Sequence, residues 1–517
     1  QHFWESSVAL LLNTANVASV LDYLMARGMI VADENTLFGG EKQYRFRHSL
    51  YRDVAYEMIP RTKRESYHKL MFAWLLERIA NNVEQYVLLA EQFSYAGEYL
   101  AALQTYLEAV EVQIDLNQEY QALKMIDTGL SIANNVDREF ALPVVAKLWS
   151  YRGKALIGLE RYEEASAASQ SALMLLDELP DEQLVTSRIM ANRILGLSNI
   201  SLGRYNDAYD ALTRAHNLLP RNAHNQVTSV LIAFGRLYGY QSRLEESHAY
   251  HKRALLNAEK SQDLQLIAEA LSQLGLIDFQ KGNLADAMHS YQDSLQIHQS
   301  LALIREQALD LFHIGLVHLH MFDYAKAYEY FSDAEYLKET IGRTNLLVQG
   351  YRALSLILLG RVGQGKALLA DATSNVLRNV DMQQRLQLVN IQSYAVLDDY
   401  ANVRDQAMVF IQQEIVNPSL KARVLRYLGI ASHHLGTNDA LDHLHNALNT
   451  EKDYAGLNLW LCHISLGQIS PDKAIQSQHY TIAQTMINER VKRLSAYPEM
   501  LSAFLGHDTV KQVLELG

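Results

Sequence analysis

The sequence predicts an all-α fold in which paired helices repeat along the chain behind a small amino-terminal module with two short strands. Three observations lead to this prediction. Only 7 of the 517 residues are proline and 25 are glycine, which leaves long stretches free to form helix. From about residue 145 onward, small residues recur with a period of about 37 to 43 residues. Residues 1–60 break that period and carry a Gly-Gly turn between two apolar stretches.

The amino-terminal module is expected to span residues 1–60. We predict a helix ending at Gly28, then strands at residues 29–32 and 43–46 on either side of the Gly-Gly turn. A helix over "LYRDVAYEMI" follows and ends at Pro60, because proline removes a helical hydrogen bond. Helix, two-stranded wing and helix together indicate a winged-helix module.

The rest of the chain divides into three predicted parts. Residues 61–140 form a helical connector with two entry repeats, residues 141–450 form the main repeat array, and residues 451–517 form capping helices.

The repeat is defined by three small residues in each unit. One lies in the middle of a helix, a second lies 12 residues later, and a third follows 7 residues after that. The last two share one face of the second helix, where the axes of two antiparallel helices cross closely. The six sets are Gly153, Ala165 and Ala172; Gly196, Ala208 and Ala215; Gly235, Ser247 and Ala254; Gly275, Ala287 and Ser294; Gly315, Ala327 and Ala334; Ala353, Gly365 and Ala372. Over residues 145–450 this pattern resembles the tetratricopeptide-repeat family in its longer-period variety, which implies a superhelical solenoid.

A second resemblance lies in "YRFRHSLYRDVAYEMIPRTKRESYHKL". It looks like the segment that joins winged helix to repeats in STAND-type signalling ATPases, including cyclase-linked ATPases and maltose-activator-type regulators. The matching positions are Phe46, His48, Ala55, Tyr56, Arg61, Arg64 and His68. The carboxyl-terminal "YPEMLSAFLGHDTVKQVLELG" resembles the closing helix of such proteins. In that class a nucleotide-binding domain precedes the winged helix, so the resemblance implies a sensor arm whose partner is an upstream ATPase domain.

One stretch, "LILLGRVGQGKALLA", almost matches the phosphate-binding loop G-x-x-x-x-G-K-[ST]. Its Gly360 aligns with a turn between repeat helices, and Gly365 occupies the small-residue position of the second helix. Ala367 stands where the loop needs Ser or Thr, and a helix rather than a strand is expected before it. The repeat therefore predicts that Lys366 lies within a helix and binds no nucleotide.

The sequence offers no other catalytic or metal-binding pattern. It contains no H-E-x-x-H, paired C-x-x-C, G-x-S-x-G or calcium loop. The histidines of "HIGLVHLH" (His313, His318 and His320) point in different directions on a helix and cannot meet at one ion. Cys462, the only cysteine, is expected to be a small buried residue. We therefore expect no enzymatic activity, no cofactor and no metal.

The composition indicates the cellular compartment in which the protein is found. A single cysteine indicates a reducing compartment and a cytoplasmic protein. No apolar run approaches the roughly 18 residues that cross a membrane. The start resembles no signal peptide and lacks an initiator methionine, so we expect the chain to be part of a longer, bacterial-type protein.

The function predicted from these features is a non-catalytic sensor or protein-interaction arm. A solenoid presents a concave surface lined by the first helix of each pair, suited to a peptide, a protein or a small inducer. Counting from the mid-helix glycine predicts that the ligand-binding face includes Lys154, Arg193, Arg236, Tyr240, Gln280, His320 and Gln392. The three cations in this set suit an anionic peptide or a carboxylate-bearing inducer.

The alternative is a DNA-binding transcriptional regulator whose winged helix contacts DNA and whose repeats bind a signal peptide. Between Glu41 and Leu70 the chain carries eight Lys or Arg against four acids, although its net charge is −12. These cations spread over strand, helix and linker rather than one recognition face, which disfavours DNA.

Overall fold

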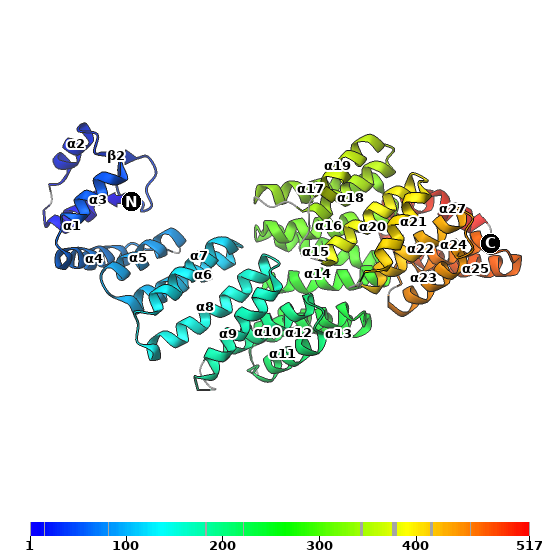
Figure 1. The fold of residues 1–517 in the computed structure, drawn as a ribbon, viewed down its shortest axis with the longest axis horizontal. Helices are drawn as coiled ribbons and strands as arrows, with labels where there is room; N and C mark the ends of the chain where they lie inside the picture. Colours follow the sequence, from blue (N-terminus) through cyan, green and yellow to red (C-terminus); the bar gives the residue numbers. More distant parts are fainter. Residues whose placement is uncertain are drawn as a thin grey trace. The chain divides into compact units, whose positions relative to one another are not determined.

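The structure, a computed structural model, describes residues 2–14, 16–80, 82–180, 184–220, 222–341, 345–374, 380–413, 417–454 and 456–515. These residues form 27 α-helices and three short β-strands, so the predicted all-α class is confirmed. The helices pack as successive hairpins within two compact units, Gln1–Leu202 and Gly203–Gly517 (Figure 1).

The first unit begins with a three-stranded antiparallel sheet in the order β1-β3-β2. The strands are β1 (His2–Trp4), β2 (Ile30–Asp33) and β3 (Gln43–Phe46). β2 and β3 match the two predicted strands to within a residue. β1 was not predicted, because three residues ("HFW") are too short to show an alternating pattern. The division of the chain at residues 60, 140 and 450 stays a prediction.

An aromatic cluster fastens the sheet to the first long helix. Trp4 stacks on Trp74 with ring centroids 5.4 Å apart, and Phe38 packs edge-on against both. The Trp74 indole N–H also donates to the Ser6 hydroxyl at 3.0 Å. The helices of this unit are α1 (Glu5–Leu12), α2 (Ala18–Ala26), α3 (Ser49–Glu57), α4 (Arg61–Leu76), α5 (Val83–Tyr95), α6 (Tyr99–Asp115), α7 (Glu119–Ala133), α8 (Arg138–Gly158), α9 (Tyr162–Asp177) and α10 (Val185–Ser201).

The second unit continues with helical pairs and ends in a carboxyl-terminal segment. Its helices are α11 (Tyr205–Asn217), α12 (His224–Tyr240), α13 (Leu244–Ser261), α14 (Leu264–Lys281), α15 (Leu284–Ser300), α16 (Ile304–His320), α17 (Tyr324–Thr340), α18 (Leu346–Leu358), α19 (Val362–Ser374), α20 (Val380–Val396), α21 (Tyr400–Ile411), α22 (Pro418–His434), α23 (Ala440–Tyr454), α24 (Leu459–Ile469), α25 (Lys473–Arg493), the 3₁₀ turn η1 (Leu494–Ala496), α26 (Pro498–Gly506) and α27 (Asp508–Glu515). The predicted closing helix is therefore two helices, since His507 between them has an extended backbone.

All the small residues of the six predicted sets are buried, and the glycines explain the close helix contacts. In the second unit, a bulky ring 16 residues after the glycine packs directly onto it. A Cβ on Gly315 would lie 2.6 Å from the Phe331 ring, and one on Gly275 would lie 2.9 Å from the Tyr291 ring. His251 takes the same place opposite Gly235. Glycine is thus required at these positions because the ring of the second helix occupies the space of a side chain.

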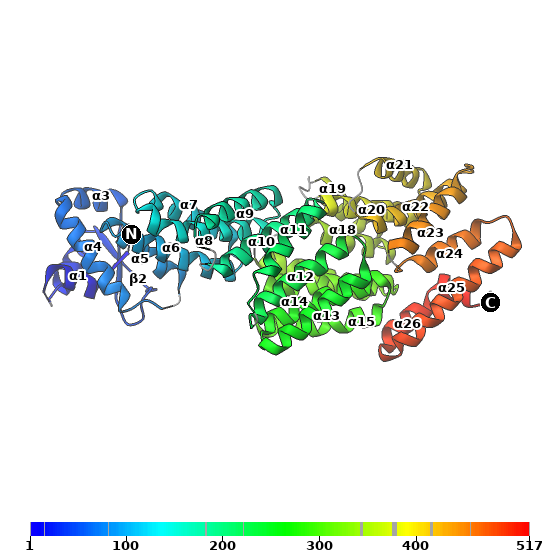
Figure 2. The ribbon, with the colours of Figure 1, turned by 90° about the horizontal axis from the view of Figure 1, so that it is seen from below.

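The carboxyl-terminal segment returns to earlier repeats of the second unit. Helices α25 to α27 share one hydrophobic core with α15 to α18, in which Phe504 and Val510 are fully buried. The turn η1, which follows α25, contacts α15 (Figure 2). Lys326 of α17 forms an ion pair with Glu499 of α26. This return brings the carboxyl-terminal helices against helices that lie much earlier in the chain.

Candidate functional site: an arginine pocket

A pocket of about 300 Å³ opens where the carboxyl-terminal segment meets the first helices of four successive pairs. One wall comes from α16, α18, α20 and α22, which supply His320, Leu354, Gln392 and Arg423 among others. The other wall comes from the start of α24, from α25 and from the turn between α26 and α27. Its volume falls at the lower end of the range for small-molecule sites.

Phe322 anchors the carboxyl-terminal wall. Its ring stacks on the His507 ring with centroids 3.7 Å apart and lies parallel to Phe504 at 6.0 Å. Phe322 has a φ of +63°, a left-handed conformation that is unfavourable for a bulky residue. Forty residues earlier the same turn position is Gly282, with a φ of +81°. The contacts of Phe322 with the carboxyl-terminal segment therefore offset the strain of its backbone conformation.

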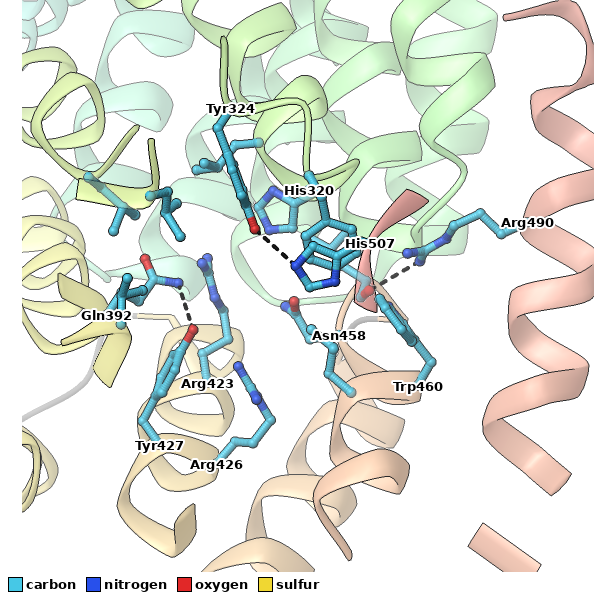
Figure 3. A pocket seen from close by; sticks show the side chains of 17 residues that line it. His320, Tyr324, Gln392, Arg423, Arg426, Tyr427, Asn458, Trp460, Arg490 and His507 are labelled. Atoms are coloured by element: carbon cyan, nitrogen blue, oxygen red, sulfur yellow. Dashed lines mark hydrogen bonds between the residues drawn. The ribbon is translucent and has the colours of Figure 1, made fainter. Parts of the chain in front are cut away.

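Three arginines give the pocket its charge. Arg423 and Arg426 rise into it from α22, and Arg490 enters from α25 on another side (Figure 3). No Asp or Glu lines the pocket, and none of the three forms an ion pair with a carboxylate of the described residues. Arg490 only donates to the Leu457 carbonyl at 3.2 Å and lies over the Trp460 ring at 5.4 Å. Burial lowers the pKa of Arg490 to about 10, so it is still charged at neutral pH.

Glu451 is a buried acid on α23 that contacts Asn458 of the pocket lining. One oxygen accepts the Asn458 backbone N–H at 2.9 Å, and the other has no partner. Burial raises the pKa of Glu451 to about 7, although Arg423 and Arg426 act to lower it. Near neutral pH this carboxyl is therefore partly protonated and only partly offsets the arginines.

His320, His507 and Tyr324 are the neutral titratable side chains of the pocket whose pKa values are shifted. Burial and the charges of Arg423 and Arg490 lower the pKa of His320 to about 3. Burial also lowers the pKa of His507 and raises the pKa of Tyr324 to about 12. The His507 Nδ1 accepts the Thr509 N–H at 3.3 Å, so its Nε2 carries the hydrogen and donates to the Tyr324 hydroxyl oxygen at 3.3 Å.

Two of the seven residues predicted for the ligand-binding face, His320 and Gln392, line this pocket. Arg236, Tyr240 and Gln280 are half-buried on α12 and α14 of the same unit, away from the pocket. Lys154 and Arg193 belong to the first unit, on α8 and α10, and the Lys154 ammonium lies 4.0 Å from the Asp115 carboxylate. Within the second unit the structure does not bring the five residues into one pocket, and ligand contact by any of the seven stays a prediction.

The arginines of the pocket were missed. Arg426 lies three residues before Gly429, whose added Cβ would clash with Leu444 of the next helix. It thus obeys the same counting rule as Arg193, applied several repeats further along the chain. Arg490 and His507 lie outside the repeat, and no periodic pattern points to them.

The phosphate-loop resemblance of residues 360–366 is explained by a helical turn. Gly360, with a φ of +79°, ends the turn after α18, and Lys366 is exposed within α19. An added Cβ on Gly365 would lie 2.7 Å from the Ala353 carbonyl oxygen, as expected for a helix-crossing position. Cys462 is 1% exposed, and burial raises the pKa of its thiol to about 12, which makes it unreactive.

The three histidines of α16 have separate surroundings, as predicted. His313 stacks on Tyr291, His318 faces Asp323 at 3.2 Å, and His320 bonds the Leu316 carbonyl. Within the part of the chain that the structure describes, no three His, Cys, Asp or Glu side chains are placed to hold a metal ion.

Most cations of the basic amino-terminal segment are paired with acids from the segment itself or from neighbouring residues of the fold. Five of its eight cations form ion pairs: Lys42 with Glu5, Arg45 with Asp33, Arg52 with Asp53, Arg61 with Glu65, and Lys69 with Glu98. Arg64 instead donates to the Glu57 and Ile59 carbonyls and lies over the Tyr56 ring. Paired cations contribute less to phosphate binding, which weakens the DNA-binding alternative.

The residues of the second resemblance form a connected joint. The Tyr56 hydroxyl lies 2.9 Å from His68 Nε2, and His68 Nδ1 lies 2.7 Å from the Gln92 side-chain oxygen. Two motif side chains, Tyr56 and His68, thus connect α3 to α4, and the contact of His68 with Gln92 extends the joint to α5.

Comparison with known proteins gives matches among solved structures alone. No family model matches the chain, and no curated protein matches its sequence. Similar solved structures include the apo form of the quorum sensor NprR from B. thuringiensis, with 13% identity, a TM-score of 0.45, and 67% of this chain and 98% of that chain covered. NprR in complex with its cognate peptide NprX gives 13% identity, a TM-score of 0.48, and coverages of 68% and 98%.

A STAND protein with a tetratricopeptide-repeat sensor from Pyrococcus horikoshii is also similar. Its identity to this chain is 16%, its TM-score is 0.42, and 91% of this chain and 62% of that chain are covered. At such identities and TM-scores the fold assignment rests on the helical hairpins and buried small residues of this chain. Among the described residues, none of the helices combines the length and the apolar character needed to cross a membrane.

Proposed function

We propose that the chain is a non-catalytic ligand-sensing arm and that its signal is a small anionic molecule bound in the arginine pocket. The observation that carries this proposal is the convergence of Arg423, Arg426 and Arg490 on one concave pocket whose lining contains no acid. Burying charges without a partner is costly, so the fold alone gives no reason to gather three arginines there. An anionic ligand supplies the missing partner through charge-assisted hydrogen bonds.

The construction of the pocket suits a sensor. Arg423 and Arg426 belong to the repeats, whereas Arg490 and His507 belong to the carboxyl-terminal segment. A ligand held by both parts stabilises their contact by RT ln(1 + L/Kd), where L is the free ligand concentration. The signal is then an increase in the population of molecules in which the repeats and the carboxyl-terminal segment are in contact.

The partner that reads this signal would be the upstream ATPase domain implied by the joint motif. Helix α3 supports such a partner, because it buries none of its residues and exposes Leu50 and Val54, and Met58 directly after it is also exposed. An exposed apolar helix next to the joint is suited to contact with another domain.

The test uses hexanoate as the probe and its uncharged analogue hexanamide as the control ligand. Binding is followed by the fluorescence of Trp460, which lines the pocket and is the only tryptophan in the second unit. Hexanoate is expected to bind the wild type, and Arg426→Met is expected to weaken binding at least about tenfold, as loss of a charge-assisted hydrogen bond does. Lys366→Met, an equal loss of charge at an exposed site away from the pocket, is expected to change nothing. Equal binding of hexanoate and hexanamide, or an equal loss in both variants, overturns the proposal.

A further inference from the structure

The arginine pocket contains polar atoms of two kinds that have no partner. Two are donors: the Arg426 Nε and the Asn458 Nδ2, the latter on a side chain that is 5% exposed. The third is an acceptor, the Gln392 Oε1, on a side chain that is 9% exposed. Unpartnered buried polar atoms are rare in native proteins because each costs about 1–3 kcal/mol. Within a pocket they mark positions that a ligand satisfies.

His320 adds a second acceptor. Its Nδ1 lies 2.9 Å from the Leu316 carbonyl oxygen, which can only accept, so Nδ1 carries the hydrogen. Because the pKa of His320 is lowered to about 3, its Nε2 is unprotonated at neutral pH. The described residues give this nitrogen no partner, and His320 points into the pocket (Figure 3).

The donor and acceptor atoms come from different helices around an apolar interior. The donors belong to α22 and to the residue before α24, whereas the acceptors belong to α16 and α20. Leu319, Leu354, Leu358 and Val396 supply the apolar surface on the side of α16, α18 and α20. A plain fatty acid satisfies the arginines and the leucines but leaves the Gln392 and His320 acceptors unsatisfied.

The group that reaches these acceptors must itself be neutral. An ammonium donor placed in this pocket meets three guanidinium groups, and like charges in a partly dry site repel strongly. A hydroxyl or an amide N–H donates without that penalty.

We propose that the pocket selects an amphipathic organic acid that carries, away from its acid group, a neutral O–H or N–H donor for Gln392 and His320. This inference rests on the proposed function and adds the second recognition element. The acid group pairs with Arg423, Arg426 and the Asn458 amide, and the apolar body covers Leu354 and Val396.

The experiment compares matched pairs of probes: hexanoate with 6-hydroxyhexanoate, and octanoate with 8-hydroxyoctanoate. Dissociation constants for the full chain are taken from Trp460 fluorescence and checked by ligand-observed NMR. In at least one pair the hydroxy acid is expected to bind about tenfold more tightly, the gain for satisfying a buried acceptor.

Variants assign that gain to its residues. Gln392→Leu combined with His320→Leu is expected to abolish the preference for the hydroxy acid while leaving hexanoate binding within about twofold. Gln273→Leu, the same change at a half-buried glutamine outside both the pocket and the predicted ligand-binding face, is the matched control and is expected to keep the preference. Thermal melting of each variant establishes that it is folded.

The outcomes separate the two proposals. If hexanoate binds and Arg426→Met weakens it, but the hydroxyl adds nothing in either pair, the donor requirement is wrong and the sensor pocket stands. A preference that survives the Gln392→Leu/His320→Leu change also overturns the inference. If none of the four acids binds the wild type, both proposals fail.

Discussion

The buried carboxyl of Glu451 gives the protein a pH dependence that can be assigned to one residue. Glu451 is 1% exposed, and one of its oxygens has no hydrogen-bond partner. Replacing it by glutamine keeps the acceptor for the Asn458 N–H and removes the buried charge. Glu451→Gln is therefore expected to stabilise the second unit at alkaline pH and to change little in acid.

The magnitude follows from the pKa. Burial raises the pKa of Glu451 from 4.5 to about 7, and each unit is worth about 1.4 kcal/mol, so the full effect is about 3 kcal/mol. The folded state holds the proton more tightly than the unfolded state, so the stability linked to this group is greatest below about pH 4.5. It is lost progressively as pH rises to about 7 and stays lost above that.

The assay is urea-induced unfolding of wild type and variant at pH 5 and pH 8, followed by Trp460 fluorescence. The neighbouring histidines with lowered pKa values destabilise the fold toward acid in both proteins, so the difference between the two isolates Glu451. Between pH 5 and pH 8 the free energy of unfolding of the variant is expected to rise by about 3 kcal/mol relative to that of wild type. A difference that does not change with pH would refute the assignment of a raised pKa to Glu451.

Three further substitutions test the packing. Gly315→Ala is expected to lower the free energy of unfolding by about 1–3 kcal/mol, because the new methyl group meets the Phe331 ring. Gly363→Ala, on the exposed face of α19, is expected to be neutral or slightly stabilising. Chemical unfolding measures both, and equal effects would contradict the close packing of α16 on α17. Phe322→Gly removes the strain of a left-handed backbone, yet it is expected to lower the melting temperature because the stacking on His507 is lost. Ser242→Gly, at a similar φ of +60°, is expected to raise the melting temperature. A higher melting temperature for both variants would show that the Phe322 ring does not stabilise the carboxyl-terminal segment. His251→Phe is expected to stabilise the protein by about 1 kcal/mol, because the buried His251 Nδ1 has no hydrogen-bond partner. It is also expected to reduce the loss of stability as pH falls from 6.5 to about 3, because burial lowers the pKa of His251 to about 3. Unfolding curves at pH 4 and pH 7 that match those of wild type would count against this.

The repeat could be predicted from the sequence because its physics is local. Gly235, Gly275 and Gly315 recur every 40 residues, and each faces a ring 16 residues later, so one chain segment carries both partners of the contact. The same locality explains why the phosphate-loop resemblance at Lys366 could be dismissed before the fold was known.

The pocket could be predicted only in part because it depends on contacts between distant segments. His320 and Gln392 follow from the repeat register, and Arg426 would have followed from counting back from Gly429. Arg490 and His507 reach the pocket because the last helices return to α15–α18, driven by burial of apolar residues such as Phe504. The return leaves no periodic signal in the sequence, and at the turn position that Gly282 occupies one repeat earlier the periodicity does not predict the bulky Phe322 that receives it.

The central claim is that the pocket arginines are kept for a ligand rather than for the fold. The most direct test is the melting temperature of Arg423→Met/Arg426→Met without any ligand, at pH 6, where Glu451 is mostly protonated. Methionine keeps the apolar length of the side chain and removes a charge that has no carboxylate partner. The account predicts a melting temperature equal to or higher than that of the wild type. A fall of several degrees would contradict it, because the two arginines would then be structural.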